Sequence, residues 1–178
     1  FLIKTLKTFM NWSYEKEYHD NPKFKKFKAK EDETEIIYLT MDELMTLYNF
    51  EFESESLNRT RDVYVFNCVT GLRISDCKAL KSSNIGKDYL TITIIKTKAI
   101  NTKIPLNKFS REILAKYKDT IHEPLPIISD QKFNKYIKVC CDKAGINTLI
   151  TKTRYVGQKR VDLTVPKWKL ITSHTARK

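Results

Sequence analysis

The stretch FNCVTGLRISDCKAL, residues 66–80, places an arginine between a glycine turn and the start of a helix. Gly71 is a typical helix stop, because glycine adopts the left-handed conformation at little cost. Ser75 is a residue type that caps a following helix. The guanidinium of Arg73 must therefore point either into water or at an anion. Unpaired N–H groups at a helix start favour the same anion, so this segment predicts an anion-binding pocket.

The end of the sequence repeats this arrangement. In SHTARK, His174 and Arg177 stand three residues apart, so both side chains project from one face of a helix that Ser173 can cap. Lys96 and Lys98 lie between the two arginines in the sequence, and either can supply an ammonium group. We therefore expect two arginines, a histidine and a lysine to serve one phosphate.

The composition favours a polyanionic partner. The 178 residues include 33 Lys and Arg against 21 Asp and Glu, a net charge of +12. Such a charge favours nucleic acid above an anionic membrane or an acidic protein. The sequence has no run of about 20 apolar residues, and its early lysines do not fit a secretory signal. We expect a soluble, cytoplasmic protein with no membrane partner.

The four cysteines indicate neither a metal site nor a disulfide framework. Cys68, Cys77, Cys140 and Cys141 form no CxxC pair, and the histidines are not clustered. We expect buried, reduced thiols and no bound metal.

The chain divides into two parts in its sequence pattern. Residues 1–18 carry an apolar helical stripe that begins without a cap, so residues 1–20 are predicted to end a preceding domain. Residues 21–37 lack periodicity and contain a basic run followed by an acidic run, which is typical of a linker. Residues 38–178 are predicted to form a second domain.

The second part predicts a mainly helical α+β fold. Thr40 and Glu43 have the capping-box spacing ahead of a first helix. The alternation in DYLTITIIKTK, followed by TKIPL, predicts a β-hairpin. Residues 149–173 are predicted to be an extended basic segment that can form strands. Further helices are predicted over residues 57–69, from Ser75 onward, and over 107–118, 129–145 and the last residues.

Three motifs together carry a resemblance to a known family. TGLRISD, a lysine-bearing hairpin ending in IPL, and HTAR occur in this order. They resemble the catalytic domain of the tyrosine recombinases, the family of phage and conjugative-transposon integrases. The resemblance spans residues 36–178, and IKTLKTFMNW is similar to the last helix of that family's core-binding (SAM-like) domain. It implies a tyrosine-recombinase catalytic-domain fold with a small antiparallel sheet.

The resemblance also implies roles for individual residues. Arg73 matches the first catalytic arginine, and His174 with Arg177 matches the family's HxxR pair. Asp76 matches the acidic residue that supports the first arginine. Neither Lys96 nor Lys98 falls at the family's usual offset from the IPL segment. Lys96 is assigned as the hairpin lysine on the assumption of a slightly longer turn, and Lys98 is the alternative.

The implied activity is site-specific cleavage and rejoining of double-stranded DNA. A tyrosine attacks the phosphodiester and forms a 3′-phosphotyrosine, with no metal and no nucleotide cofactor, and the family acts as tetramers on two duplexes. Independently of the name, phosphoryl transfer builds negative charge that fixed arginines neutralise. A lysine can protonate the leaving oxygen, and a histidine can bind the phosphate or accept the proton of the nucleophile.

One component of the family's site is absent from this sequence. None of the nine tyrosines follows HTAR before the sequence ends at Lys178. We therefore expect a catalytic domain truncated before its nucleophile and inactive alone, or else a non-catalytic DNA-binding remnant of an integrase. A basic RNA-binding or scaffold protein with accidental motif matches is the third alternative.

Each predicted site residue also has a purely structural interpretation. Arg73 can be solvated, and Asp76 can be a favourable charge in a first helical turn. Lys96 and Lys98 can blunt an exposed strand edge. Convergence of the segments that carry Arg73, Lys96 and the HxxR pair would distinguish a strand transferase from these alternatives.

Overall fold

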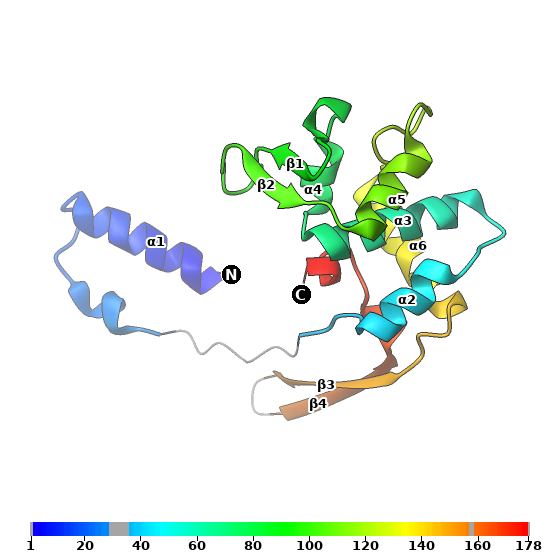
Figure 1. The fold of residues 1–178 in the computed structure, drawn as a ribbon. Coiled ribbons are helices and arrows are strands. Elements are labelled where there is room, and N and C mark those ends of the chain that lie inside the picture. The colour runs from blue at the N-terminus through cyan, green and yellow to red at the C-terminus, as the bar shows by residue number, and fades with distance from the viewer. Residues whose placement is uncertain (1, 29–35, 157–158, 178) are drawn as a thin grey trace. The chain divides into compact units, whose positions relative to one another are not determined.

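The computed structural model describes residues 2–28, 36–156 and 159–177, and side chains at 154–156 are not described. The chain forms two compact units, Phe1–Glu35 and Ile36–Lys178 (Figure 1). Within the described ranges, no helix has the length and apolar character that a bilayer crossing requires.

The first unit contains helix α1, Leu2–Glu15, where a helix was predicted, and a 3-10 helix, η1, at Pro22–Lys26. The 3-10 helix η1 lies within the stretch 21–37 that was predicted to be a linker. Asn21 caps this turn by accepting from the N–H of Lys23, and the ring of Phe24 packs edge-on against His19. Aromatic packing therefore offsets the absence of a helical sequence period. The remaining linker positions 29–35 lie outside the described residues.

The second unit is mainly helical, with two small antiparallel hairpins, as predicted (Figure 1). Its α-helices are α2 Met41–Asn49, α3 Glu55–Thr70, α4 Ile74–Lys78, α5 Lys108–Tyr117 and α6 Asp130–Lys143. Its 3-10 helices are η2 Ser82–Asn84, η3 Lys167–Leu170 and η4 Thr175–Arg177. Strands β1 Tyr89–Ile92 and β2 Thr102–Pro105 form one hairpin, and β3 Leu149–Val156 and β4 Lys159–Pro166 form the other.

Several predicted helix boundaries are confirmed by the local chemistry. Thr40 accepts from the N–H of Glu43 while the Glu43 carboxylate accepts from the N–H of Thr40, which completes the capping box. The Ser129 hydroxyl caps α6 by accepting from the N–H of Lys132, and Gly71 ends α3 with a φ of 68°. The predicted cap at Ser75 is wrong, since α4 begins at Ile74 with Arg73 in the N-cap position.

The first hairpin is shorter than its alternating sequence suggests. Its register pairs Tyr89 with Pro105 and Ile92 with Thr102, so the strand does not extend to the lysines. Lys98 and Asn101 have positive φ angles of 55° and 52°, which interrupt an extended strand. Lys96 and Lys98 therefore lie in the connection between the strands.

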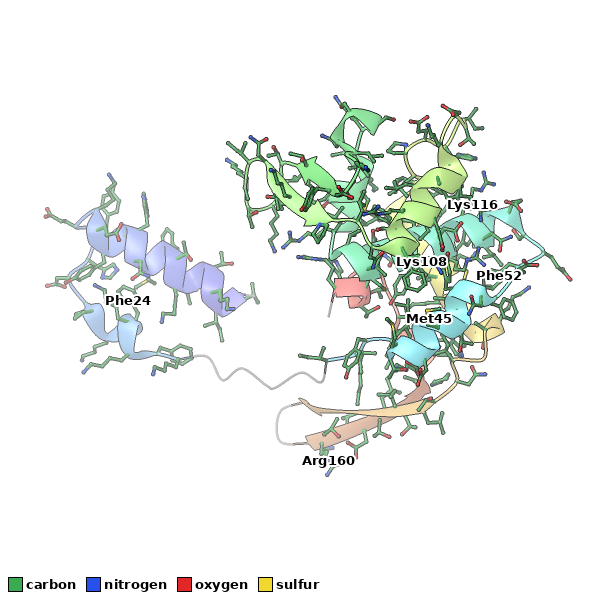
Figure 2. The ribbon with its side chains drawn as sticks, in the orientation of Figure 1. Phe24, Met45, Phe52, Lys108, Lys116 and Arg160 are labelled. Carbon is green, nitrogen blue, oxygen red and sulfur yellow. The ribbon has the colours of Figure 1, made fainter. Side chains whose placement is uncertain are left out.

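The second hairpin projects from the helical body and is exposed along most of its length (Figure 1). Figure 2 shows Arg160 near its far end, away from the helices. The expected strands are therefore present in the basic stretch 149–173. At the hairpin base, the buried Lys167 ammonium pairs with the Glu43 carboxylate at 2.5 Å, which joins β4 and η3 to α2.

Helix α3 is the centre of the core. Val63, Tyr64 and Phe66 are completely buried, and the helix contacts α2, α5 and α6. The cysteines contribute to the same core, where Cys77, Cys140 and Cys141 are buried free thiols and Cys68 is partly buried. In the described ranges, no group of three or more His, Cys, Asp or Glu side chains could hold a metal ion.

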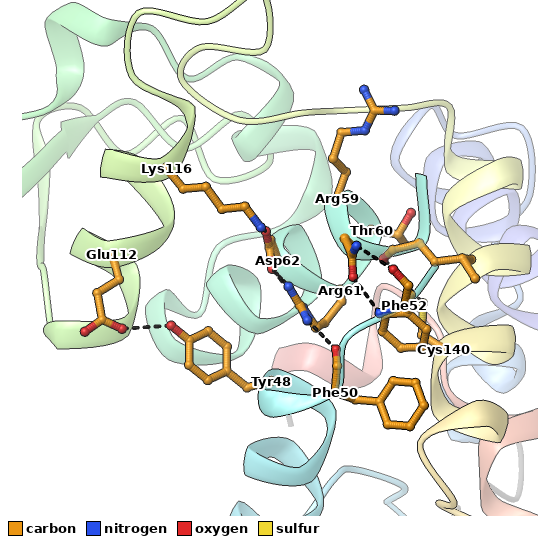
Figure 3. Close-up of polar contacts among 12 residues, drawn as sticks. Tyr48, Phe50, Phe52, Arg59, Thr60, Arg61, Asp62, Glu112, Lys116 and Cys140 are labelled. Carbon is orange, nitrogen blue, oxygen red and sulfur yellow. Dashed lines mark hydrogen bonds and ion pairs between the residues drawn. The ribbon is translucent and has the colours of Figure 1, made fainter. Parts of the chain in front are cut away.

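A charge network is buried with α3 (Figure 3). The Asp62 carboxylate accepts from Nε of Arg61 at 2.9 Å, from Nζ of Lys116 at 2.8 Å and from the hydroxyl of Tyr117 at 2.6 Å. The Arg61 guanidinium also donates to the carbonyl of Phe50. Because Lys116 and Tyr117 belong to α5, this carboxylate joins the two helices.

Replacement of Asp62 by alanine should therefore be strongly destabilising. Arg61 is only 7% exposed, and its charge would lose its counterion. We expect a loss of about 3–5 kcal/mol in the free energy of unfolding, measured by urea denaturation. Glu112→Gln, which removes a carboxylate from the exposed Tyr48 and Lys108 contacts, is the control and should cost no more than about 1 kcal/mol. Equal losses in the two variants would contradict a special role for the buried network.

Candidate functional site

The two arginine motifs meet at the carboxyl end of α3. Gly71 occupies the C-cap in the left-handed conformation, and its carbonyl accepts a hydrogen bond from Nε of Arg177. The last carbonyls of a helix lack intrahelical donors and carry partial negative charge, so a guanidinium is favoured there. The contact brings HTAR against TGLR across 106 residues of sequence, and Figure 1 shows η4 beside the end of α3.

Asp76 joins the arginine turn to the first hairpin. The residue is only 3% exposed. Its carboxylate accepts from the N–H of Arg73 at 3.4 Å and from the N–H of Ile95 at 3.1 Å, and Nη1 of Arg73 lies 4.0 Å away. The bond to Ile95 is long-range, so Asp76 does more than place a favourable charge in a first helical turn.

The same contact locates the hairpin lysines. Lys96 directly follows Ile95, so its backbone is held next to the Asp76 carboxylate. Lys98 lies further along the connection, and both lysines are exposed. The choice of Lys96 over Lys98 stays a prediction, but Lys96 is the lysine adjacent in sequence to the anchored position.

The HTAR turn is anchored by residues that the sequence reasoning missed. The hydroxyl of Thr175 lies 3.0 Å from that of Tyr64 on α3, and it accepts from the N–H of Thr172 at 3.1 Å. The N–H of Ser173 donates to the Asn134 side chain on α6 at 2.8 Å. The predicted terminal helix is a 3-10 turn, Thr175–Arg177, and the Thr175 hydroxyl makes its stabilising bonds where Ser173 was expected to do so.

The resulting surface, which we call the arginine surface, is formed by Arg73, His174 and Arg177 and is suited to an oxyanion. Arg177 and His174 are exposed, the Arg73 side chain is 25% exposed, and Arg177 uses Nε for Gly71, which leaves its terminal nitrogens for a ligand. Guanidinium groups bind phosphate oxygens in pairs. The contribution of the N–H groups at the start of α4 stays a prediction, because Asp76 accepts from the N–H of Arg73, the N-cap residue that precedes them.

The tyrosine bonded to this turn is not placed for nucleophilic attack. Tyr64 is completely buried, and burial raises the pKa of its hydroxyl well above the ordinary value. A phosphodiester on the surface cannot reach this oxygen. In the described part of the chain, no tyrosine follows the HTAR turn.

These features define the class of fold: the chain has the fold of the tyrosine recombinase catalytic domain. A lambda integrase tetramer bound to a Holliday junction is similar with a TM-score of 0.61 and 22% identity, covering 82% of this chain and 47% of that one. A lambda integrase(75-356) dimer bound to a COC′ core site gives 0.64 and 21%, covering 82% and 56%.

Among curated proteins, the tyrosine recombinase XerC of Pediococcus pentosaceus is 21% identical over 125 residues. That match covers 68% of this chain and 42% of XerC, so the chain spans less than half the length of this relative. No protein-family model matches the sequence.

The geometry predicts different consequences for Asp76 and for the two arginines. Asp76→Ala would leave two backbone N–H groups without their acceptor and should cost about 1–3 kcal/mol in urea unfolding. Arg73→Ala and Arg177→Ala should each cost about 1 kcal/mol or less, because these side chains meet solvent. Asp88→Ala, which removes an exposed pair with Arg111, is the matched carboxylate control. A large loss in either arginine variant would make that arginine structural.

Proposed function

We propose that this chain is the catalytic part of a site-specific DNA recombinase or integrase that acts through a phosphotyrosine intermediate. The observation that carries the proposal is the Arg177–Gly71 contact, which brings the two arginine motifs together on a tyrosine-recombinase fold. The solved lambda integrases are bound to DNA core sites or a Holliday junction, which supports double-stranded DNA as the partner. An element such as a phage or conjugative transposon would be the source of that DNA.

The proposed roles follow from the chemistry of each group. Arg73 and Arg177 bind the non-bridging oxygens and stabilise the charge that builds on the phosphate. Asp76 positions Arg73 and the Lys96 segment. Lys96 protonates the departing 5′ oxygen, and His174 binds the phosphate or accepts the proton of the nucleophile. Removal of one arginine should raise the barrier by about 3 kcal/mol, if it acts as an oxyanion donor.

We extend the proposal to the rest of the chain. Residues 1–20 serve as the last helix of a core-binding domain, and the full-length protein assembles as a tetramer, as the lambda integrase on a Holliday junction does. The basic hairpin β3–β4, the lysines of residues 23–30 and the arginine surface contact DNA phosphates.

Binding of duplex DNA should therefore depend steeply on salt. Each neutralised phosphate contributes a slope of about 0.9 to the log–log plot of affinity against salt concentration. Arg73→Ala and Arg177→Ala should each weaken DNA binding, measured by fluorescence anisotropy. Each should also reduce the magnitude of the slope by about 0.9, the contribution of one phosphate. Lys108→Ala removes an 81%-exposed cation on α5 and is the charge-matched control. Affinity that does not change with salt would contradict the proposal.

A non-catalytic, DNA-binding remnant is the second candidate function. The observation that favours it is the burial of Tyr64, because the tyrosine bonded to the HTAR turn cannot attack DNA. Without a nucleophilic side chain, only water can attack the bound phosphodiester. The two candidates agree on DNA binding and differ in covalent chemistry.

A nicked suicide substrate distinguishes the two candidates. The 178-residue chain should bind this DNA and form no covalent adduct on a denaturing gel. Expression of the gene through its own stop codon should give a protein that forms an adduct, and this adduct should disappear when a tyrosine downstream of HTAR is changed to phenylalanine. An adduct with the 178-residue chain would overturn the assignment of the nucleophile. A full-length protein that binds DNA but stays inert would favour the remnant.

A further inference from the structure

A cationic pocket lies at the opposite end of α3 from the arginine surface. It has a volume of about 190 Å³ and is lined by Arg59, His122 and Lys132, the hydroxyl residues Ser56 and Tyr136, and three apolar residues. Helix α3 has 16 residues and is therefore about 24 Å long, and the pocket lies at its Glu55 end. The pocket is thus distinct from the site at Gly71.

The lining carries positive charge and contains no carboxylate. By contrast, the pocket beside the buried network is lined by the carboxylates of Glu51, Asp62 and Glu112 as well as by cations. In the described ranges no carboxylate forms an ion pair with Arg59 or Lys132. Two cations therefore face one cavity without a counterion.

The contacts of Arg59 leave its charge uncompensated. Its Nε donates to the backbone carbonyl of Glu55 at 3.2 Å, and Nη1 contacts Nε2 of His122. An arginine can only donate, so Nε2 is the acceptor in this contact. The arginine thus contacts an imidazole nitrogen where a carboxylate would neutralise its charge.

Lys132, on α6, also lacks a carboxylate partner. The acidic residue in the first turn of this helix, Asp130, pairs with Lys78 at 2.8 Å and not with Lys132. Ser56 and Tyr136, which also line the cavity, carry hydroxyl groups that can donate hydrogen bonds. The first turns of α3 and α6 both contribute to the lining, and their partial positive charge adds to that of the side chains.

We propose that this pocket binds a tetrahedral oxyanion of the size of phosphate. Arg59 and Lys132 hold the oxygens as charged donors, and Ser56 and Tyr136 add neutral hydrogen bonds. The cavity has room for an anion of this size. The ligand is either a free phosphate or phosphate monoester, or a backbone phosphate of DNA, since the chemistry is shared.

The test uses the 178-residue chain with Arg73→Gln and Arg177→Gln, so that the arginine surface does not contribute. Inorganic phosphate is titrated at constant ionic strength with chloride as the balancing ion, and backbone NMR shifts report the position of binding. We expect saturable shifts at the first turns of α3 and α6. Arg59→Ala and Lys132→Ala should each weaken binding about tenfold or more, because each removes a charged donor.

Two matched lysines on the same helix serve as controls. Lys135→Ala and Lys138→Ala remove α6 lysines that do not line the pocket, and they should change the affinity less than twofold. If Arg59→Ala fails to fold, the exposed Lys132 decides the question, because its replacement leaves no buried group unpaired. The proposal would be overturned if the Arg73→Gln, Arg177→Gln chain bound phosphate equally well with and without Arg59→Ala or Lys132→Ala. Full competition by chloride would also overturn it.

Duplex DNA distinguishes the two sources of phosphate. If Arg59→Ala and Lys132→Ala lose phosphate binding but keep the affinity for DNA, the ligand is a free phosphate compound. If both affinities fall, a DNA backbone phosphate occupies the pocket. A negative result in the phosphate or the DNA experiment does not bear on the proposed function, because Arg73→Ala and Arg177→Ala test the arginine surface separately.

Discussion

The carboxylate of Asp62 sets the constraint on which the rest of the second unit depends. Helix α3 is surrounded by α2, α5 and α6, so the charges of Arg61 and Asp62 can be buried only if they neutralise each other. The bonds to Lys116 and Tyr117 then hold α5 against this axis. Both candidate ligand sites lie at the ends of α3, so their positions follow from the packing of one helix.

The arginine surface shows how a helix end brings distant cationic segments together. Gly71 ends α3 in a conformation that exposes a carbonyl, and that carbonyl binds Arg177. Asp76 uses one carboxylate to hold two backbone groups, at Arg73 and Ile95. Three distant segments therefore share one anchored turn, while the arginine side chains keep nitrogens for a ligand. Rigid positioning of donors is what stabilises a charged transition state.

The errors of sequence reasoning have identifiable causes. The 3-10 turn at residues 22–26 was not predicted, because its aromatic contacts follow no sequence period. The first strand was predicted to be longer because the alternation continues past Ile92, where the strand ends and the N–H of Ile95 donates to Asp76. Ser75 is a good capping residue, but Arg73 occupies the cap because Asp76 accepts its N–H. The bond between Asp76 and Ile95 is long-range, whereas the other two contacts join residues within five positions of each other.

The sequence by itself determined the mainly helical fold, the helix ends at Thr40, Gly71 and Ser129, and the resemblance of three motifs to a recombinase. These depend on local chemistry, in which a cap or a stop acts within a few residues. Only the tertiary structure decided that Arg177 contacts Gly71 and that Asp76 contacts Ile95. The same holds for the uncompensated cations beside Ser56, because a long-range contact depends on which surfaces pack, and burial decides that over the whole chain.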